Sequence, residues 1–424
     1  MRIALVSQEY PPETARGGLG TQTYAKAHGL AGLGHDVWVI SHGEDQQRHE
    51  YRDGAVGVIR ISGFDDRRPM HTVEAWWLTH SMAVAAALVD LHARLHLDIV
   101  DFADYGAEGF AWLLNRPAAK RVPAVIQLHG SLAMLAHAIG WPEIDSEFYR
   151  TGTCMEGTCM RLADAIFSSS AVSADWCARA QGISRDAIDI IHTGVDTSHF
   201  SPRDVSKDPR PTIVFVGRLV ESKGVSLLVE AAARLTARIP GLCLRLIGRG
   251  EPDVIDSLKT LARSSSNADL LEFVGHVGRE DLPDYLSPSH VFAAPSVYEG
   301  GPGFVYLEAM ACGLPVVACS GSGADEVITH GRNGLLVPPR DLGALVSALD
   351  SLLSDDVRRT AMGAEGRRFV VDQADTDQCI RRLEAFYQSV TARNTSVATA
   401  EGRTAVTTPD GDTPPLRRAA SVSE

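Results

Sequence analysis

Short apolar runs rich in Val and Ile alternate with longer amphipathic stretches along almost the whole chain. This alternation is typical of repeated strand and helix units, in which consecutive strands lie parallel in one sheet. The chain has 424 residues, which exceeds the size at which one hydrophobic core keeps growing. We therefore predict an α/β protein with two doubly wound domains.

The apolar runs form two series that are separated by a polar segment. Residues 200–211 contain three prolines and have no hydrophobic periodicity, so we interpret them as the interdomain linker. We assign 1–205 to the first domain, 206–374 to the second, 375–392 to a final helix and 393–424 to a disordered tail. The predicted strands are Ile3–Ser7, Val37–Ser41, Ile99–Phe102, Ala124–Leu128, Ala165–Ser168 and Ile188–His192, then Thr212–Val216, Leu242–Ile247, Leu271–Val274, Val291–Ala294, Pro315–Ala318 and Gly334–Val337.

Composition and charge exclude several classes of function. The formal net charge of -13 argues against a surface that binds nucleic acid. The N-terminus lacks the pattern of a signal peptide, so we expect a cytoplasmic protein. Trp76–Leu91 contains His80 and Asp90 and is too short for a membrane span, so we predict a core helix there; peripheral membrane contact stays open. The seven cysteines have irregular spacing, which predicts reduced thiols and no zinc site.

A glycine-rich loop, Gly17 to Gly20, lies between the first predicted strand and a helix that opens near Thr21. Glycines let a ligand approach the backbone, and amides at a helix N-terminus favour anions. The loop lacks the G-x-G-x-x-G spacing of dinucleotide-binding proteins, which disfavours a dehydrogenase. Phosphate binding and a plain turn without a ligand both stay open from these residues alone.

Two cations lie on one predicted strand-to-helix loop of the second domain. Arg218 follows the strand, and Lys223 precedes a helix that starts near Val225. Together they could hold a diphosphate, because each charge-assisted contact contributes about 1.5–3 kcal/mol when it is shielded from water. The alternative is a pair of solvated surface charges.

A second polar, glycine-rich loop lies within Ala294–Pro315. Glu299 is followed by the sequence GGPG at 300–303, and Glu308 lies on the next predicted helix. A strand, a glycine-rich loop and a helix N-terminus form a typical anion cradle. The Glu308 carboxylate could accept hydrogen bonds from sugar hydroxyls; the alternative is a buried acid that is satisfied within its own helix.

The joint order of these motifs resembles that of the retaining glycosyltransferases with the GT-B fold, the large family related to glycogen and sucrose synthases. The resemblance extends to about Ala392 and implies two Rossmann-like domains that face each other across a cleft, with the final helix crossing back to the first. The matching stretches are GGLG (17–20), QLHG (127–130), IHTGVDTSHFSP (191–202), VGRLVESKG (216–224), RLIGRGE (245–251), EFVGHV (272–277), APSVYEGGPGFVYLEAMACGLPVVA (294–318) and HGRNGLLVPPRD (330–341).

The resemblance implies a role for each matching residue. Arg218 and Lys223 match the pair that binds the donor diphosphate as it leaves, and Glu308 matches the acid that binds the ribose. His129 matches a histidine near the donor sugar, and 275–277 match a loop whose backbone reads the base. We therefore expect catalytic roles for His129, Arg218, Lys223 and Glu299, donor-binding roles for Gly18, Arg218, Lys223, Arg249, Gly275, His276, Val277, Gly301, Gly303, Phe304 and Glu308, and acceptor-side roles for Gly17, Gly18 and Gly20.

The spacing of the two glutamates departs from the family pattern. The family separates them by seven residues, whereas eight residues lie between Glu299 and Glu308. Counted back from Glu308, Gly300 occupies the position of the first glutamate. The role of Glu299 is therefore less firmly implied than that of Glu308.

The resemblance implies transfer of a hexose-type sugar from a UDP- or GDP-sugar, with retained anomeric configuration, to a glycan, lipid-linked or small-molecule acceptor. It implies no metal and no cofactor, since cations and helix amides can stabilise the leaving diphosphate. Asp101 and Asp104 are conceivable bases, but no carboxylate pair predicts a glycosidase. A nucleotide-sugar epimerase, a phosphorylase and a catalytically silent sugar-nucleotide binding module remain as alternatives.

Overall fold

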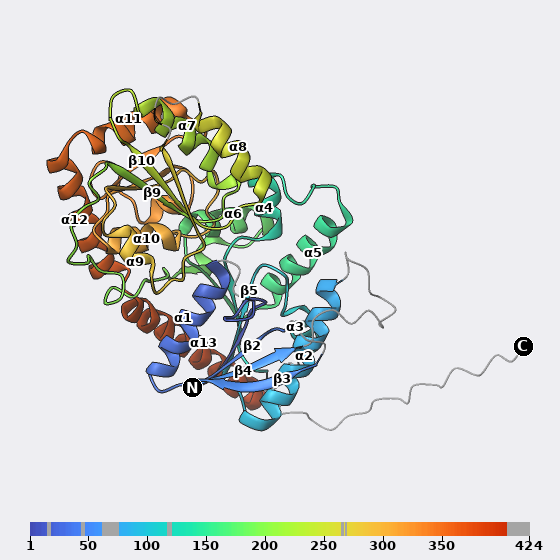
Figure 1. Cartoon of the computed structure of the whole chain (residues 1–424). Helices are drawn as coiled ribbons and strands as arrows, with labels where there is room; N and C mark the ends of the chain where they lie inside the picture. The colour runs from blue at the N-terminus through green and yellow to red at the C-terminus, as the bar shows by residue number, and fades with distance from the viewer. Residues whose placement is uncertain are drawn as a thin grey trace, which may run out of the picture.

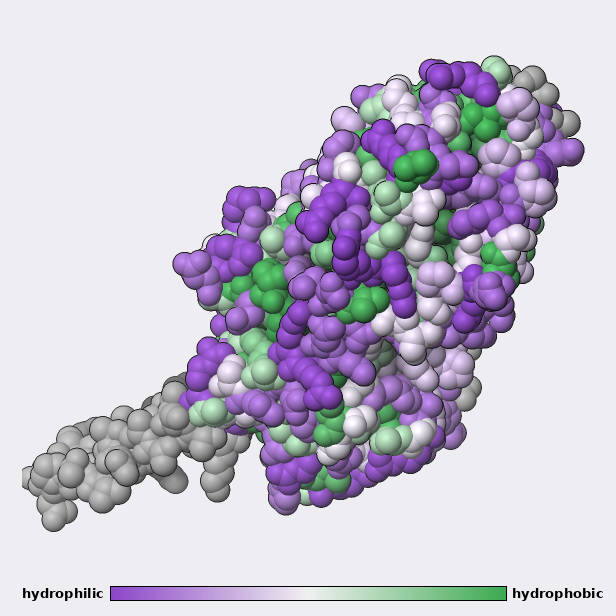
Figure 2. Space-filling model, turned by 90° about the vertical axis from the view of Figure 1, so that its left-hand side faces the viewer, coloured by the Kyte–Doolittle hydropathy of each residue, from purple (hydrophilic) through white to green (hydrophobic). Residues whose placement is uncertain are grey.

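The computed structural model describes residues 1–14, 18–43, 47–61, 76–116, 121–263, 267 and 269–404, with side chains as far as 394. Figure 1 shows two lobes, each built around one sheet that is covered by helices. The predicted architecture of two doubly wound α/β domains is therefore confirmed. The face shown in Figure 2 is mostly polar, and its apolar side chains lie in small separate groups.

The first sheet has eight strands in the order β3-β4-β2-β1-β5-β6-β7-β8. Only β3 and β4 pair in antiparallel fashion among these described strands. The six strands predicted for this half are present, and their ends differ from the prediction by two residues at most. The bounds are β1 Arg2–Val6, β2 Asp36–His42, β3 His49–Asp53, β4 Val56–Ile61, β5 Ile99–Ala103, β6 Ala124–Leu128, β7 Ala165–Ser168 and β8 Ile188–Ile190.

The sequence prediction missed the pair of β3 and β4. β3 has the sequence HEYRD, which lacks an apolar run, and β4 contains Arg60 next to its last residue. Arg60 is fully buried. Its guanidinium donates to three backbone carbonyls, those of Tyr10, Pro11 and His42. Because these partners lie far away in the sequence, nothing local signals that the buried charge is satisfied.

Among the described residues of the first half, six helices, α1 to α6, accompany the first sheet. The predicted core helix is α2, in which Trp77, Val84 and Leu88 are buried. No helix among the described residues is long and apolar enough to cross a membrane. The bounds are α1 Gly18–Gly32, α2 Trp76–Leu95, α3 Phe110–Asn115, α4 Leu132–Ile139, α5 Glu147–Leu162 and α6 Ala171–Gln181.

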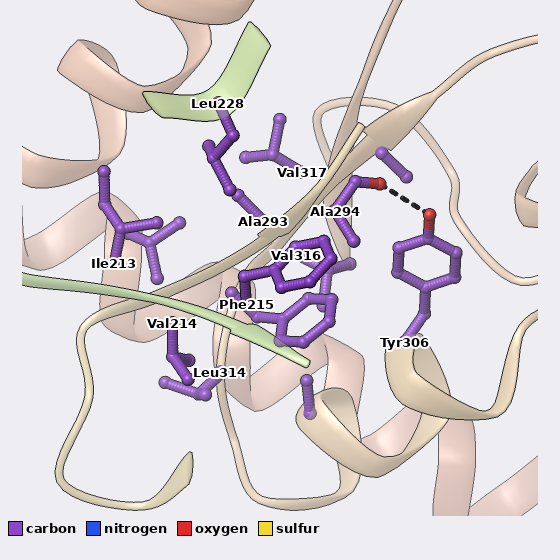
Figure 3. Packing of buried hydrophobic residues seen from close by; sticks show 14 of the residues in the cluster. Ile213, Val214, Phe215, Leu228, Ala293, Ala294, Tyr306, Leu314, Val316 and Val317 are labelled. Carbon is purple, nitrogen blue, oxygen red and sulfur yellow. Dashed lines mark hydrogen bonds between the residues drawn. The ribbon is translucent and has the colours of Figure 1, made fainter. Parts of the chain in front are cut away.

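The second sheet has six parallel strands in the order β11-β10-β9-β12-β13-β14. Their ends agree with the prediction to within one residue. In Figure 3, side chains of β9, β12 and β13 pack together, and the Tyr306 hydroxyl donates to the Ala294 carbonyl at 2.6 Å. The bounds are β9 Thr212–Val216, α7 Val225–Leu235, β10 Cys243–Ile247, α8 Pro252–Ala262, β11 Leu271–Gly275, α9 Leu282–Leu286, β12 Val291–Ala294, α10 Phe304–Ala311, β13 Val316–Cys319, β14 Gly334–Val337, α11 Leu342–Leu353 and α12 Asp356–Gln373.

The chain passes into the second domain earlier than the predicted boundary at 205. Val195 and Phe200 are buried in the core of the second domain. Val195 also forms a parallel bridge with Asp375. The two connections between the domains therefore run side by side, and the apolar Phe200 belongs to the second domain and not to a free linker.

The final helix, α13 Thr376–Thr404, returns to the first domain and lies beside α1. The Tyr387 hydroxyl donates to the buried Asp101, and His35 contacts Glu384 at 2.9 Å. The crossing helix is thus present, but it extends beyond the predicted end at 392. Helix α13 therefore occupies the first part of the predicted tail, 393–424, as far as Thr404, and the rest of that tail lies outside the described residues.

Candidate active site

Lys223 and Glu299 meet at the carboxyl edge of the second sheet. Lys223 ends a short 3-10 turn directly before α7, and Glu299 lies in the loop between β12 and α10. The Lys223 Nζ atom donates to Glu299 Oε1 at 2.6 Å. The side chains are 29% and 15% exposed, so water screens the pair only in part. Two predicted catalytic residues are in direct contact despite the extra residue in the GGPG loop.

Arg218 and Arg249 follow the neighbouring strands β9 and β10 at the same edge. Both are exposed, and neither guanidinium has a side-chain partner among the residues that the structure describes. The Leu219 amide donates to the Arg249 carbonyl at 2.8 Å, which holds the two loops together. Both cations are therefore available to an anion at this edge.

The predicted base-reading segment continues this edge at the end of β11. Gly275 and His276 are exposed, and Val277 is half-buried. The Gly275 carbonyl accepts the Gly248 amide at 2.7 Å, which links the β11 loop to the β10 loop. The loops after β9, β10 and β11 thus form one continuous rim.

Sequence reasoning missed Arg279 as a partner of Glu308. Glu308 is buried on α10, and its Oε1 atom accepts the Arg279 Nε at 2.8 Å. The Arg279 guanidinium also lies 5.7 Å from the centre of the Phe304 ring. The one available signal was the position of Arg279, two residues after the predicted base-reading segment. The Glu308 carboxylate therefore has its hydrogen-bond partner outside α10. The alternative that it is satisfied within its own helix does not hold.

Gly303 permits the sharp turn before α10. Its φ is +75°, which favours glycine, and a Cβ atom there would lie 2.6 Å from the Tyr306 ring. Phe304 begins α10 and is half-buried. A Cβ atom on Gly301 would lie 2.9 Å from the Ser169 hydroxyl of the first domain. The loop around GGPG is therefore packed closely against the opposite domain.

The first domain presents the start of α1 and the loop after β6. The Gly20 amide donates to Glu9 Oε2 at 3.1 Å, and a Cβ atom on Gly18 would lie 3.9 Å from the Phe304 ring. Gly17 lies outside the described residues. Burial and, to a smaller extent, the nearby Lys26 cation lower the pKa of the His129 imidazole to about 3. His129 is therefore neutral at physiological pH.

Gly300 brings the loop of Glu299 into contact with the first domain. The hydroxyls of Ser170 and Ser173, at the start of α6, both donate to the Gly300 carbonyl, the former at 2.7 Å. A Cβ atom on Gly300 would lie 2.3 Å from the His129 carbonyl oxygen. Gly300, which matches the position of the family's first glutamate, therefore makes a close backbone contact with the first domain and has no room for a side chain.

Neither aspartate considered as a base is open to a substrate. Asp101 is buried and accepts Lys26 Nζ at 2.6 Å as well as the Tyr387 hydroxyl. Asp104 is buried and accepts the backbone amides of His129 and Gly130. Both carboxylates face the protein interior, so a role as general base is disfavoured.

The described residues contain no group of three or more His, Cys, Asp or Glu side chains that could hold a metal ion. All seven cysteines are free thiols.

Comparison with known proteins decides the family. The sequence pattern described as "Glycosyltransferase Family 4" matches residues 16–199, and that of "Glycosyl transferases group 1" matches residues 197–369. The GDP-mannose-dependent alpha-(1-6)-phosphatidylinositol monomannoside mannosyltransferase of Mycolicibacterium smegmatis is 32% identical over 278 residues, or 61% of this chain and 68% of that protein. The chain belongs to the group 1, family 4 glycosyltransferases.

This glycosyltransferase is also 29% identical to the glycogen synthase of Mycobacterium tuberculosis over 388 residues, or 87% of this chain and 90% of that protein. Its fold resembles the solved sucrose-phosphate synthase of Thermosynechococcus elongatus with a TM-score of 0.77 at 24% identity, covering 92% of this chain and 99% of that one. The predicted GT-B fold is thus confirmed.

Proposed function

We propose that this glycosyltransferase moves a hexose-type sugar from a UDP- or GDP-sugar to a hydroxyl acceptor, without a metal and with retention of anomeric configuration. Support for a nucleotide-sugar donor comes from relatives whose names specify GDP-mannose and from a structural neighbour described with UDP-glucose. The acceptor is a glycan, a lipid-linked sugar or a small molecule.

The contact between Lys223 and Glu299 carries the proposal. In this proposal the Lys223 cation binds the donor diphosphate from the same strand-to-helix loop as Arg218. When a donor diphosphate binds, Lys223 exchanges the carboxylate for phosphate oxygens, and Glu299 becomes free to accept a hydrogen bond from a sugar hydroxyl. The negative charge that develops on the leaving diphosphate is then stabilised by Arg218 and Lys223.

The proposed stereochemistry is supported by the two aspartates considered as bases, because neither is open to a substrate. Asp101 and Asp104 are committed to buried partners. The leaving phosphate oxygen therefore takes the acceptor proton on the face from which it departs. His129, neutral at physiological pH, contributes a hydrogen bond to the donor sugar and carries no charge.

A panel of nucleotide sugars tests this proposal. A donor at a hundredfold excess over its Kd should stabilise the protein by about 2.7 kcal/mol, which a thermal shift detects. GDP-mannose, UDP-glucose and ADP-glucose form the first panel, and the best donor is then incubated with candidate acceptors. NMR of the product reads the anomeric configuration. Inversion would refute the retaining mechanism, and no stabilisation or transfer with any donor would refute the proposed function.

A further inference from the structure

Two buried carboxylates hold the backbone of the first-domain loop that contains His129. Asp104 follows β5, Glu156 lies on α5, and both side chains are buried. Asp104 accepts the backbone amides of His129 at 2.9 Å and Gly130 at 3.2 Å. Glu156 accepts the Leu132 amide at 2.9 Å. We call residues 129–132 the histidine loop.

The histidine loop contacts the donor loop, residues 298–303, at two glycines. Neither glycine has room for a side chain. Gly130 has a φ of +137°, and a Cβ atom there would lie 2.3 Å from the Tyr298 hydroxyl. A Cβ atom on Gly300 would lie equally close, 2.3 Å, to the carbonyl oxygen of His129. A shift of the histidine loop therefore displaces the backbone next to Glu299.

We propose that Asp104 is a positioning residue for sugar transfer, which fixes the backbone of His129 and Gly130 against the donor loop. This inference rests on the proposed function, since it assigns a role within the same site. An ionised carboxylate accepts two amides at once. Asparagine offers one oxygen and turns an NH₂ donor toward the second amide. The charge of Asp104, and not only its size, is therefore needed.

The pH dependence of transfer gives an independent readout. Burial raises the pKa of Asp104 to about 6, against the opposite effect of the amides that it accepts. Glu156 on α5, Cys177 on α6 and Tyr298 in the donor loop face this charge, and burial raises the pKa of each. His129, with a pKa of about 3, does not titrate near pH 6. Since protonated Asp104 resembles asparagine, kcat should fall as the pH drops through about 6.

Asp104→Asn tests the role, with Asp164→Asn as a matched control. Asp164 accepts the Ala124 amide at 2.8 Å and pairs with Arg116, at the opposite end of β6 from the histidine loop. Both variants remove one negative charge that holds a backbone amide, although Asp164 is only half-buried. The control therefore reports the structural cost alone, without a displacement at the cleft.

We expect Asp104→Asn to lower kcat by about 10- to 100-fold, because a displacement of about 1 Å can cost a factor of that size. The KM for the donor and the Kd for the nucleoside diphosphate should change by less than about twofold, since the proposed diphosphate contacts lie in the second domain. Asp164→Asn should keep the wild-type kcat. Between pH 8 and 5, kcat should fall for the wild type, and it should fall less for Asp104→Asn.

The outcomes separate two failures. A wild type that transfers no sugar refutes the proposed function and, with it, this inference. An active wild type whose Asp104→Asn variant keeps its kcat, or loses no more than Asp164→Asn, overturns the positioning role. If Asp104→Asn does not fold, the wild-type profile decides, and a kcat that is constant from pH 8 to 5 overturns the role.

Discussion

Replacing Lys223 with alanine tests the proposed diphosphate site most directly. The change removes the cation that lies 2.6 Å from Glu299. Loss of one preorganised charge stabiliser lowers kcat by about 10²–10³-fold, or about 2.7–4 kcal/mol in the barrier. The effect on stability should be small, because a partly exposed ion pair contributes about 1 kcal/mol or less. The variant should therefore lose most of its turnover while its free energy of unfolding changes little.

The assay is initial-rate transfer from the best donor, with thermal unfolding of the same samples. Lys259→Ala is the matched control, since it removes one lysine of the second domain that pairs with Asp256 at 3.1 Å on the exposed face of α8. The control should retain the wild-type kcat. A Lys223→Ala enzyme with wild-type turnover would show that Lys223 does not stabilise the leaving diphosphate.

Three further outcomes are expected. Transfer should survive EDTA; loss of activity that magnesium or manganese restores would reveal a metal requirement. Arg279→Ala should lower the free energy of unfolding in urea by about 2 kcal/mol, because it leaves the buried Glu308 carboxylate unpaired. The control Arg234→Ala, which breaks an exposed ion pair, should change the free energy of unfolding by less than about 0.5 kcal/mol. Tyr298→Phe should leave the unfolding free energy unchanged or raise it by about 1 kcal/mol, since the buried hydroxyl has no partner among the described residues; a clear loss would contradict this.

Strand positions could be predicted because each buried parallel strand is a short run of apolar residues in the sequence. β9, bounded by Thr212 and Val216, was predicted to the residue. β3 was missed because HEYRD carries no apolar signal, and its partner strand holds a buried arginine satisfied by distant carbonyls. Local sequence patterns indicate which residues are buried. They do not indicate hydrogen-bond partners that lie far away in the sequence.

The candidate site shows the same division. Lys223 could be chosen from a strand-to-helix loop that carries two cations, and Glu299 from a glycine-rich loop, but their contact depends on how the two loops fold back. Arg279 was missed because a single arginine carries no pattern, and its partner Glu308 lies 29 positions away. Asp104 was interpreted as a conceivable base, although its carboxylate serves backbone amides. Pairing across loops is a property of the tertiary structure, and only the loops themselves are visible in the sequence.

The helix that returns to the first domain determines the order in which the domains mature during synthesis. Leu383, Phe386 and Tyr387 belong to the same buried cluster as Ile3 and Leu5 of β1. These two groups of residues are separated by almost the whole length of the chain. At a synthesis rate of roughly 5–20 residues per second, the first sheet is therefore complete tens of seconds before the helix that packs on it has been made. The second domain has all its strands and helices once Gln373 has emerged. The domain that is made first is therefore the last to close its core.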